Sequence, residues 1–241
     1  MKFFLAPMQG LTGYTVRNAF HHHFDYIDKY YTPFIPAAKR MNAKIKRDID
    51  PVNNDGITLI PQAMSIVADE VIDLHRQLVP YGYDEINVNL GCPSGTVVSK
   101  KRGSGILAYP DMLDSFLDEL YTKADFPVSI KTRVGFNDDE LWPRLIEIYS
   151  KYPISELTVH PRVQKDFYKN TPRMDDFALA IQKINPDKTI LCYNGDITDT
   201  NSFNALTDCF PDIDEIMIGR GLFANPALIA ELKGISMDKA E

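Results

Sequence analysis

Short apolar segments of strand length recur eight times along this chain, and most are followed by a segment with the apolar spacing of an amphipathic helix. The strand-like segments are residues 3–8, 26–31, 58–63, 85–89, 128–132, 156–160, 189–193 and 215–218. Helical spacing is clearest in residues 69–78, 111–121, 141–149, 177–184, 202–210 and 226–232. Because strands that alternate with helices form parallel sheets, eight of them in 241 residues predict a closed α/β barrel, the (β/α)8 TIM barrel.

Nothing in the sequence divides this barrel into smaller domains. We expect residues 1–233 to form a single barrel domain and residues 234–241 to form a short polar C-terminal tail. No apolar run is long enough to cross a bilayer, so we expect no membrane contact. The three cysteines are odd in number and lack the spacing of a metal site, which favours reduced thiols, a cytoplasmic location and no bound metal.

Polar residues with useful chemistry follow seven of the eight predicted strands. The active site of a TIM barrel lies at the carboxyl ends of its strands, so these side chains are predicted to meet in one place. In chain order the residues at these strand ends, apolar neighbours included, are Pro7, Met8, Gln9, Gln62, Met64, Asn89, Cys92, Lys131, Arg133, His160, Arg162, Asn194, Gly195, Asp196, Gly219 and Arg220.

The loops after the seventh and eighth strands favour a phosphate group. TIM barrels use these two loops for phosphate, because backbone N–H groups and helix N-termini point at the anion there. Arg220 would add a charge-assisted hydrogen bond. Both loops also carry glycine, at Gly195 and Gly219, which taken singly would indicate no more than a turn.

Lys131 and Gln62 suit a flat, polar cofactor. A lone ammonium at the end of an apolar strand is costly, so Lys131 needs a partner. That partner is either the anionic edge of a reduced flavin or a salt bridge to Asp84 or Glu85 on the neighbouring strand. The Gln62 amide offers both a donor and an acceptor to the edge of a heterocycle.

Cys92 lies on a tight corner between Gly91 and Pro93, directly after the fourth strand. A thiol held there can donate a proton, accept one or attack an electrophile. A free cysteine is often just a small buried hydrophobe, but the position of Cys92 among seven equipped strand ends favours a catalytic role. His160 is either a ligand of the cofactor, phosphate or substrate, or a hydrogen-bonded histidine at a strand end.

Basic residues gather in the loops after the second, fourth and sixth strands, at the same end of the predicted barrel. They are Lys39, Arg40, Lys44, Lys46, Arg47, Lys100, Lys101, Arg102, Arg162, Lys165, Lys169 and Arg173. The net charge of −7 argues against a protein that coats nucleic acid generally. The clusters instead predict a basic mouth around the site. Residues 32–57, which include the first cluster, are expected to form an excursion over this end of the barrel.

These residues together resemble the tRNA-dihydrouridine synthase (Dus) family. Residues 6–13, Ala-Pro-Met-Gln-Gly-Leu-Thr-Gly, are similar to the opening flavin loop of that family. Residues 86–97, Ile-Asn-Val-Asn-Leu-Gly-Cys-Pro-Ser-Gly-Thr-Val, with Gly103 and Ser104 after them, match its long central motif. Lys131, His160, Arg162 and the motifs at 194–196 and 219–220 follow in family order, so the resemblance covers residues 1–230.

The resemblance implies an enzyme that uses FMN and NADPH to reduce uridine in RNA, with tRNA as the expected substrate, to 5,6-dihydrouridine. Cys92 would be the general acid that protonates C5 of uracil, opposite a hydride that passes from flavin N5 to C6. Asn89 and Tyr168 would hold the uracil ring, Arg162 would assist there, and Lys100 and Lys101 would contact RNA. FMN would be held by Pro7, Met8, Gln9, Gln62, Lys131, His160, Asn194, Gly195, Asp196, Gly219 and Arg220, the last five at its phosphate.

The sequence departs from the family pattern in two places. Pro161 occupies a position that is usually small, and members usually continue into a helical tRNA-binding domain, whereas this sequence ends at Glu241. We therefore expect a partner protein or a second chain in place of that domain. Two alternatives stay open: an FMN oxidoreductase that reduces a free pyrimidine or another small activated alkene, and a flavin-free protein that binds RNA or a partner protein.

Overall fold

The strands form one parallel sheet that closes on itself at a proline. The structure, a computed structural model, describes residues 1–24, 26–37 and 40–235, and the strands in these residues follow the order β3-β5-β6-β7-β8-β9-β10-β1-β2-β4. The last and second members of that order, β4 (Leu59–Ile60) and β5 (Gln62–Met64), are two parts of one extended segment, separated only by Pro61. Because β4 pairs with β2 and β5 pairs with β6, the sheet closes into a barrel, as predicted.

All eight predicted strands are present, although two are longer than expected. The other strands are β1 (Lys2–Leu5), β2 (Lys29–Tyr31), β3 (Ile35–Pro36), β6 (Ile86–Leu90), β7 (Val128–Gly135), β8 (Glu156–Val163), β9 (Ile190–Tyr193) and β10 (Glu215–Ile218). β7 and β8 continue past the predicted ends at residues 132 and 160, because they go on pairing with each other as far as Gly135 and Val163, across an irregularity in register. The strand ends at this side of the barrel therefore extend further than the apolar pattern indicated.

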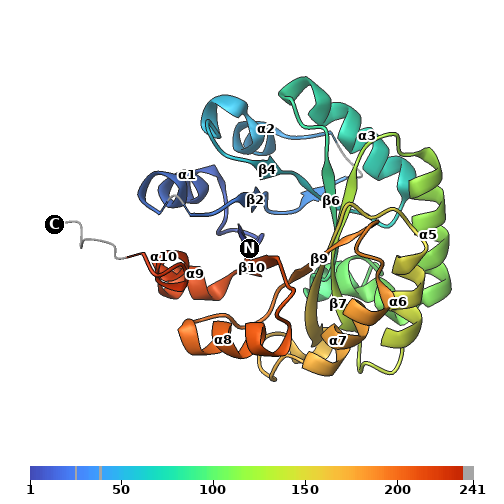
Figure 1. The fold of residues 1–241 in the computed structure, drawn as a ribbon. Coiled ribbons are helices and arrows are strands. Elements are labelled where there is room, and N and C mark those ends of the chain that lie inside the picture. Colours follow the sequence, from blue (N-terminus) through green and yellow to red (C-terminus); the bar gives the residue numbers. More distant parts are fainter. Residues whose placement is uncertain (25, 38–39, 236–241) are drawn as a thin grey trace.

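Helices surround the strands on the outside of the barrel (Figure 1). The α-helices are α1 (Tyr14–His23), α2 (Ala43–Ile49), α3 (Ala68–Leu78), α4 (Gly95–Val98), α5 (Pro110–Lys123), α6 (Trp142–Ser150), α7 (Met174–Lys183), α8 (Thr200–Cys209), α9 (Arg220–Ala224) and α10 (Leu228–Leu232). Short 3-10 helices span Pro51–Asn53, Val79–Tyr81, Gly103–Ala108 and Gln164–Asp166. None of the helices in the described residues is long and apolar enough to cross a membrane.

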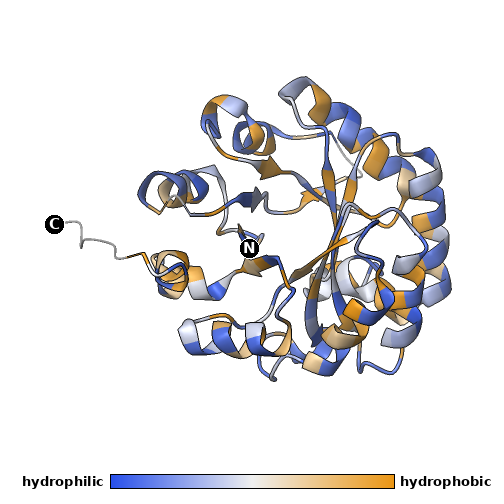
Figure 2. Ribbon diagram, viewed as in Figure 1, coloured by the Kyte–Doolittle hydropathy of each residue, from blue (hydrophilic) through white to orange (hydrophobic). Residues whose placement is uncertain are grey.

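Alternation along β6 shows how the sequence separates the two faces of the sheet. Ile86, Val88 and Leu90 belong to the large hydrophobic core between strands and helices, where they are fully buried. Asn87 and Asn89 alternate with them and point into the barrel, where both hydrogen-bond to Gln62. Figure 2 shows the same division in the helices, whose hydrophobic sides face the strands and whose hydrophilic sides face outward.

The interior of the barrel is filled below the site. A small cluster of Phe4, Ala6, Tyr31, Ile60, Cys192 and Met217 packs there, separate from the larger core. Toward the amino ends of the strands, the buried Glu156 carboxylate accepts hydrogen bonds from Tyr31 (2.7 Å) and Thr158 (2.8 Å) and forms an ion pair with Lys29 (2.7 Å). A satisfied carboxylate and a packed apolar layer close this end of the barrel, which leaves the carboxyl ends of the strands as the place for a ligand.

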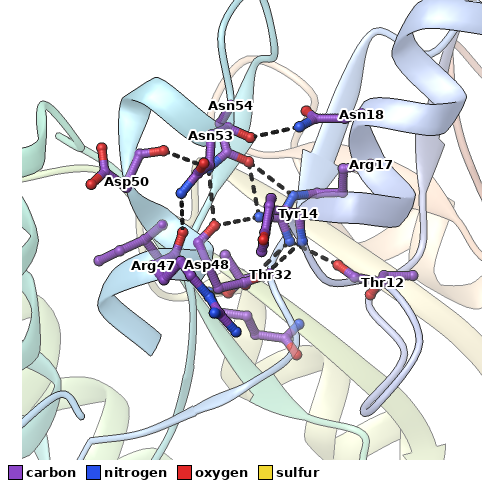
Figure 3. Close-up of polar contacts among 12 residues, drawn as sticks. Thr12, Tyr14, Arg17, Asn18, Thr32, Arg47, Asp48, Asp50, Asn53 and Asn54 are labelled. Carbon is purple, nitrogen blue, oxygen red and sulfur yellow. Dashed lines mark hydrogen bonds and ion pairs between the residues drawn. The ribbon is translucent and has the colours of Figure 1, made fainter. Parts of the chain in front are cut away.

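Residues 32–57, the predicted excursion, are tied to the loop after β1 by a buried arginine (Figure 3). The fully buried Arg17 of α1 donates from Nη1 to Thr12 O (2.7 Å) and from Nη2 to Asp48 O (2.6 Å) and Asn54 Oδ1 (2.9 Å). Thr12 in turn accepts the N–H of Met8 at Oγ1 (2.9 Å). Arg17 therefore fixes α2 and the loop of residues 6–13 relative to each other. Lys39 and residues 236–241 of the predicted tail lie outside the described residues.

Candidate active site

A cavity of about 390 Å³ opens at the carboxyl ends of the strands. Its volume falls within the range of small-molecule sites. The structure brings together there every residue predicted for the cofactor, together with three predicted for the substrate or for catalysis. These are Pro7, Met8, Gln9, Gln62, Lys131, His160, Asn194, Gly195, Asp196, Gly219 and Arg220, and then Asn89, Cys92 and Tyr168.

Three predicted residues do not line this cavity. Arg162 is 1% exposed and lies behind the wall, where its guanidinium donates to Asp196 Oδ1 (3.0 Å) and to Asn170 O (2.5 Å). Lys100 and Lys101 are exposed at the end of α4, and the Lys101 ammonium lies 4.3 Å from the centroid of the Tyr109 ring. The structure thus puts Arg162 in a supporting position and leaves the two lysines on the surface beside the Cys92 loop.

Several lining residues were not assigned a role from the sequence, and the most informative is Arg133. The others are Ala6, Leu11, Phe34, Gly91 and Pro93. The Arg133 side chain is buried and donates to three backbone carbonyl groups: Gly91 O (3.0 Å), Val163 O (2.9 Å) and Phe167 O (2.7 Å). It therefore connects the Cys92 corner with the loop that carries Tyr168, whose ring centroid lies 5.5 Å from the guanidinium. Its position two residues after Lys131, on the same face of β7, is the signal that points to it.

The Cys92 corner is fixed from two sides. The Asn89 side chain accepts the N–H groups of Gly91 (3.1 Å) and Cys92 (2.9 Å) at Oδ1. On the other side, Ser104 donates to Cys92 O from its backbone N–H (3.1 Å) and its hydroxyl (2.9 Å). Gly103 has φ +55°, and a Cβ there would lie 2.7 Å from Cys92 O, so only glycine fits this approach.

The environment of Cys92 keeps its thiol protonated. Burial raises the pKa of Cys92, and the opposing effects of the Ser94 backbone and of the cations Arg133 and Lys131 are smaller. At neutral pH the group at this corner is therefore a proton donor and not a thiolate nucleophile.

Lys131 points into the cavity and not toward the carboxylates suggested as its alternative partners. Its ammonium donates to Asn194 Oδ1 (2.5 Å), while Glu85 is hydrogen-bonded to Ser129 and Ser155. Burial lowers the pKa of Lys131 to about 7, and the positive charge of Arg133 adds to the effect. An anionic ligand beside this ammonium would reverse the shift, because it would favour the charged form.

The low pKa of Lys131 predicts how the ligand-free protein responds to pH. The folded-state pKa, about 7, is below the ordinary value of 10.5, so between these values the unfolded chain binds a proton that the folded chain does not. Folding stability should therefore rise as pH rises from 7 to 9, by up to about 1.4 kcal/mol per pH unit from this group. Urea unfolding at pH 7, 8 and 9 measures this change in the free energy of unfolding. Lys131→Met should lack this component, and identical slopes in both proteins would contradict the assignment.

Asp196 joins two arginines at the edge of the cavity. Its carboxylate forms ion pairs with Arg162 and with Arg220 (2.6 Å). Although burial opposes it, the two guanidiniums hold the pKa of Asp196 below its usual value. Burial and the surrounding cations lower the pKa of His160, so its ring is neutral, and its Nε2 accepts from Arg162 (3.2 Å).

The cavity is cationic in a chain that is acidic. Its charged lining consists of Lys131, Arg133 and Arg220 against the carboxylate of Asp196, whereas the whole chain carries −7. Gln62, Asn89 and Asn194 add neutral donors and acceptors, and the rest of the lining is mostly apolar. This donor set suits a flat, partly polar ring that carries an anionic group, which is the chemistry of a flavin phosphate.

The chain is similar to known proteins over nearly its whole length. The family model described as "Dihydrouridine synthase (Dus)" matches residues 4–241. A "Probable tRNA-dihydrouridine synthase" of Staphylococcus aureus is 34% identical over 154 residues, which is 62% of this chain and 46% of that protein. "tRNA-dihydrouridine synthase B" of Pasteurella multocida is 26% identical over 243 residues, which is 97% of this chain and 69% of that protein.

Solved structures share the fold at low identity. Morphinone reductase superposes with a TM-score of 0.64 at 10% identity and covers 100% of this chain and 87% of its own. The 3-hexulose-6-phosphate synthase of Salmonella typhimurium does so with a TM-score of 0.59 at 14% identity, covering 97% of both chains. Similarity at this level shows the fold alone. The staphylococcal match spans about half the length of that relative, but the family model covers this chain from its first strand to its last residue. The chain belongs to the dihydrouridine synthase family.

Proposed function

We propose that this protein reduces uridine in tRNA to 5,6-dihydrouridine, with FMN as its cofactor and NADPH as the electron donor. The observation that carries the proposal is a protonated thiol, Cys92, at the rim of a cationic cavity in an otherwise acidic chain. The named relatives support the reaction, since their names state tRNA dihydrouridine synthesis. A tRNA substrate and free cysteines fit a cytoplasmic enzyme.

The cavity residues divide into groups that suit the parts of a flavin. Gln62 and Lys131 would bind the polar edge of the ring, with Pro7, Met8 and Gln9 beside it. The loops of residues 194–196 and 219–220 would bind the phosphate, where Arg220 supplies the positive charge and Arg162 neutralises Asp196. When bound, the reduced flavin supplies a hydride to C6 of uracil.

Cys92 would then complete the reduction by giving its proton to C5. Asn89 and Arg133 hold the corner so that the thiol stays at one position, and a fixed donor is what general-acid catalysis requires. Tyr168, half exposed and 5.0 Å from the Arg220 guanidinium, offers a ring on which a base that has left its stack can lie. Arg162 would act indirectly, through His160 and Asp196.

The exposed basic residues beside the cavity would bind the RNA backbone. Replacing Lys100 and Lys101 by glutamate should weaken binding of a tRNA transcript and lower the slope of log affinity against log salt by about 1–2, because phosphate contacts are lost. Titration at three salt concentrations measures the slope. The control is a double variant, Lys183→Glu with Lys188→Glu, which reverses the same number of exposed charges at the other end of the barrel. It should leave the slope of log affinity against log salt unchanged. Equal slopes in both double variants would exclude Lys100 and Lys101 from the RNA surface.

The reaction itself is tested with the purified protein, FMN, NADPH and an unmodified tRNA transcript. Nucleosides released from the tRNA are then analysed by mass spectrometry, and dihydrouridine is the expected product. A parallel reaction with free uridine, uracil or orotate tests the small-molecule alternative. Turnover of a free pyrimidine without any of the tRNA would replace the proposal with that alternative. A protein that takes up no FMN would replace it with a flavin-free binding function.

A further inference from the structure

A file of four buried polar side chains runs through the barrel interior below the Cys92 corner. Asn89 Nδ2 donates to Gln62 Oε1 (2.8 Å), Gln62 Nε2 donates to Asn87 Oδ1 (2.8 Å), and Asn87 Nδ2 donates to Ser129 Oγ (3.0 Å). Gln62, Asn87 and Ser129 are completely buried and Asn89 is 8% exposed. Neighbouring strands supply them, with Gln62 beside Asn87 and Asn87 beside Ser129 in register.

The Cys92 corner determines the direction of the hydrogen bonds along this file. The N–H groups of Gly91 and Cys92 can only donate, so the Asn89 side chain must present its oxygen to them. Its NH2 group then faces Gln62, which must accept with Oε1. The Gln62 NH2 group in turn faces Asn87, which must accept with Oδ1. One orientation of each amide therefore satisfies all the buried groups, and flipping any one of them would set two donors or two acceptors against each other.

Asn87 is the first member of the file with no contact to the cavity, since Gln62 and Asn89 line it and Asn87 does not. Its Oδ1 is the acceptor that holds the Gln62 NH2 group in place. We propose that Asn87 is a positioning residue: through Gln62 and Asn89 it holds the Cys92 corner in place and sets which atoms of the Gln62 amide remain available to a ligand. The inference deepens the proposed function and rests on it for the role of the corner.

Two substitutions separate the hydrogen bonds of Asn87 from its volume. Asn87→Leu keeps a similar size and removes both the acceptor and the donor, so the Gln62 NH2 group loses its buried partner. Asn87→Asp keeps an acceptor for Gln62. At this fully buried position the neutral carboxyl is favoured, and its O–H donates to Ser129 as the amide does, so the Ser129 hydroxyl keeps its own bond to Glu85. The aspartate variant should therefore rescue what the leucine variant loses.

The test measures how fast Cys92 reacts with iodoacetamide in the ligand-free protein, by mass spectrometry of its peptide between pH 6.5 and 9.5. A loosened corner admits water to the thiol and reduces the burial that raises its pKa. Asn87→Leu should therefore react about threefold or more faster at pH 7.5, with the midpoint of the rate profile at lower pH. Asn87→Asp should match the wild type. The exposed Cys209 provides an internal reference whose rate should not change.

Thr132→Val is the matched control, since it also removes a buried hydrogen-bonding group from a neighbouring strand. The Thr132 hydroxyl bonds to Tyr149 OH (2.9 Å), between β7 and α6, outside the file. A wild-type Cys92 rate in Asn87→Leu, or an equal acceleration in Thr132→Val, would overturn the proposal. If Asn87→Leu is unfolded by circular dichroism, Asn87→Ala, which adds no bulk, carries the test with the same expected acceleration. The alkylation rate does not depend on which substrate the enzyme reduces. A failure of this test can therefore be distinguished from a failure of the proposed tRNA reaction.

Discussion

Replacing Cys92 by alanine is expected to lower the rate of uridine reduction about a thousandfold, while flavin binding and NADPH oxidation remain close to wild type. Positioned general acids contribute on the order of 10² to 10⁴ in rate, and burial keeps the Cys92 thiol protonated at the cavity. Lys131, which also lines the cavity, donates to Asn194 and is expected to bind the cofactor. The alanine side chain fits the same space, so the cofactor site should keep its shape.

Two measurements on the Cys92→Ala protein distinguish a proton donor from a packing residue. Flavin content, read from the visible spectrum, should match the wild type, and the single-turnover rate with tRNA should fall. Cys209→Ala, which removes an exposed thiol far from the cavity, should change neither. Loss of flavin from Cys92→Ala would show that the thiol is a structural part of the cavity wall, and an unchanged turnover rate would assign the proton to another group.

Replacing Arg17 by methionine is expected to destabilise the protein by about 3–5 kcal/mol. The substitution removes the donors that satisfy Thr12 O and Asn54 Oδ1 and one of the two donors to Asp48 O, and each buried acceptor left without a partner costs about 1–3 kcal/mol. It also leaves the Asp48 carboxylate, 19% exposed, without its ion-pair partner. The loop of residues 6–13 would lose its connection to α2, so affinity for FMN should fall as well.

Urea unfolding and a flavin titration measure the two consequences of the Arg17 substitution. Arg47→Met is the control, since Arg47 lies on the neighbouring helix but is exposed; it should change stability by less than about 0.5 kcal/mol. Arg17→Lys should recover little, because one ammonium cannot reach acceptors on both sides as the planar guanidinium does. A stability loss below about 1 kcal/mol for Arg17→Met would mean that water replaces the lost bonds.

The fold was largely predictable because its signals are local. Each apolar run reports a strand buried on both faces, and the residues at its carboxyl end meet in a barrel whatever their distance in sequence. The extensions of β7 and β8 were missed because Arg133 and Arg162 are charged and interrupt the apolar pattern. Both guanidiniums are buried, and each has a partner far along the chain, Gly91 for Arg133 and Asp196 for Arg162, which a local pattern cannot reveal.

The site, like the fold, was predicted where the signal is local and was missed where it depends on contacts between residues far apart in the chain. Position at the carboxyl end of an apolar strand correctly placed Gln62, Lys131 and His160 at the cavity. Arg133 received no role because two of its three acceptors are carbonyl groups of loops, at Gly91 and Phe167, and backbone groups leave no mark in the sequence. The resemblance to the family implied a role for Arg162 beside the substrate, whereas its ion pair with Asp196 becomes apparent only once the sixth and seventh strand ends are side by side.

The break at Pro61 means that the barrel is not equally cooperative around its circumference. Five residue pairs join β6 to β7, but only two join β2 to β4, and the proline supplies no N–H to the ladder. The Thr32 hydroxyl takes the place of a backbone acceptor there, for Gln62 N–H (2.9 Å). Local opening should therefore cost less at this interruption than between β6 and β7. The loop of residues 6–13 follows β1, the other neighbour of β2, so the wall of the cavity that this loop forms lies beside the interrupted part of the ladder.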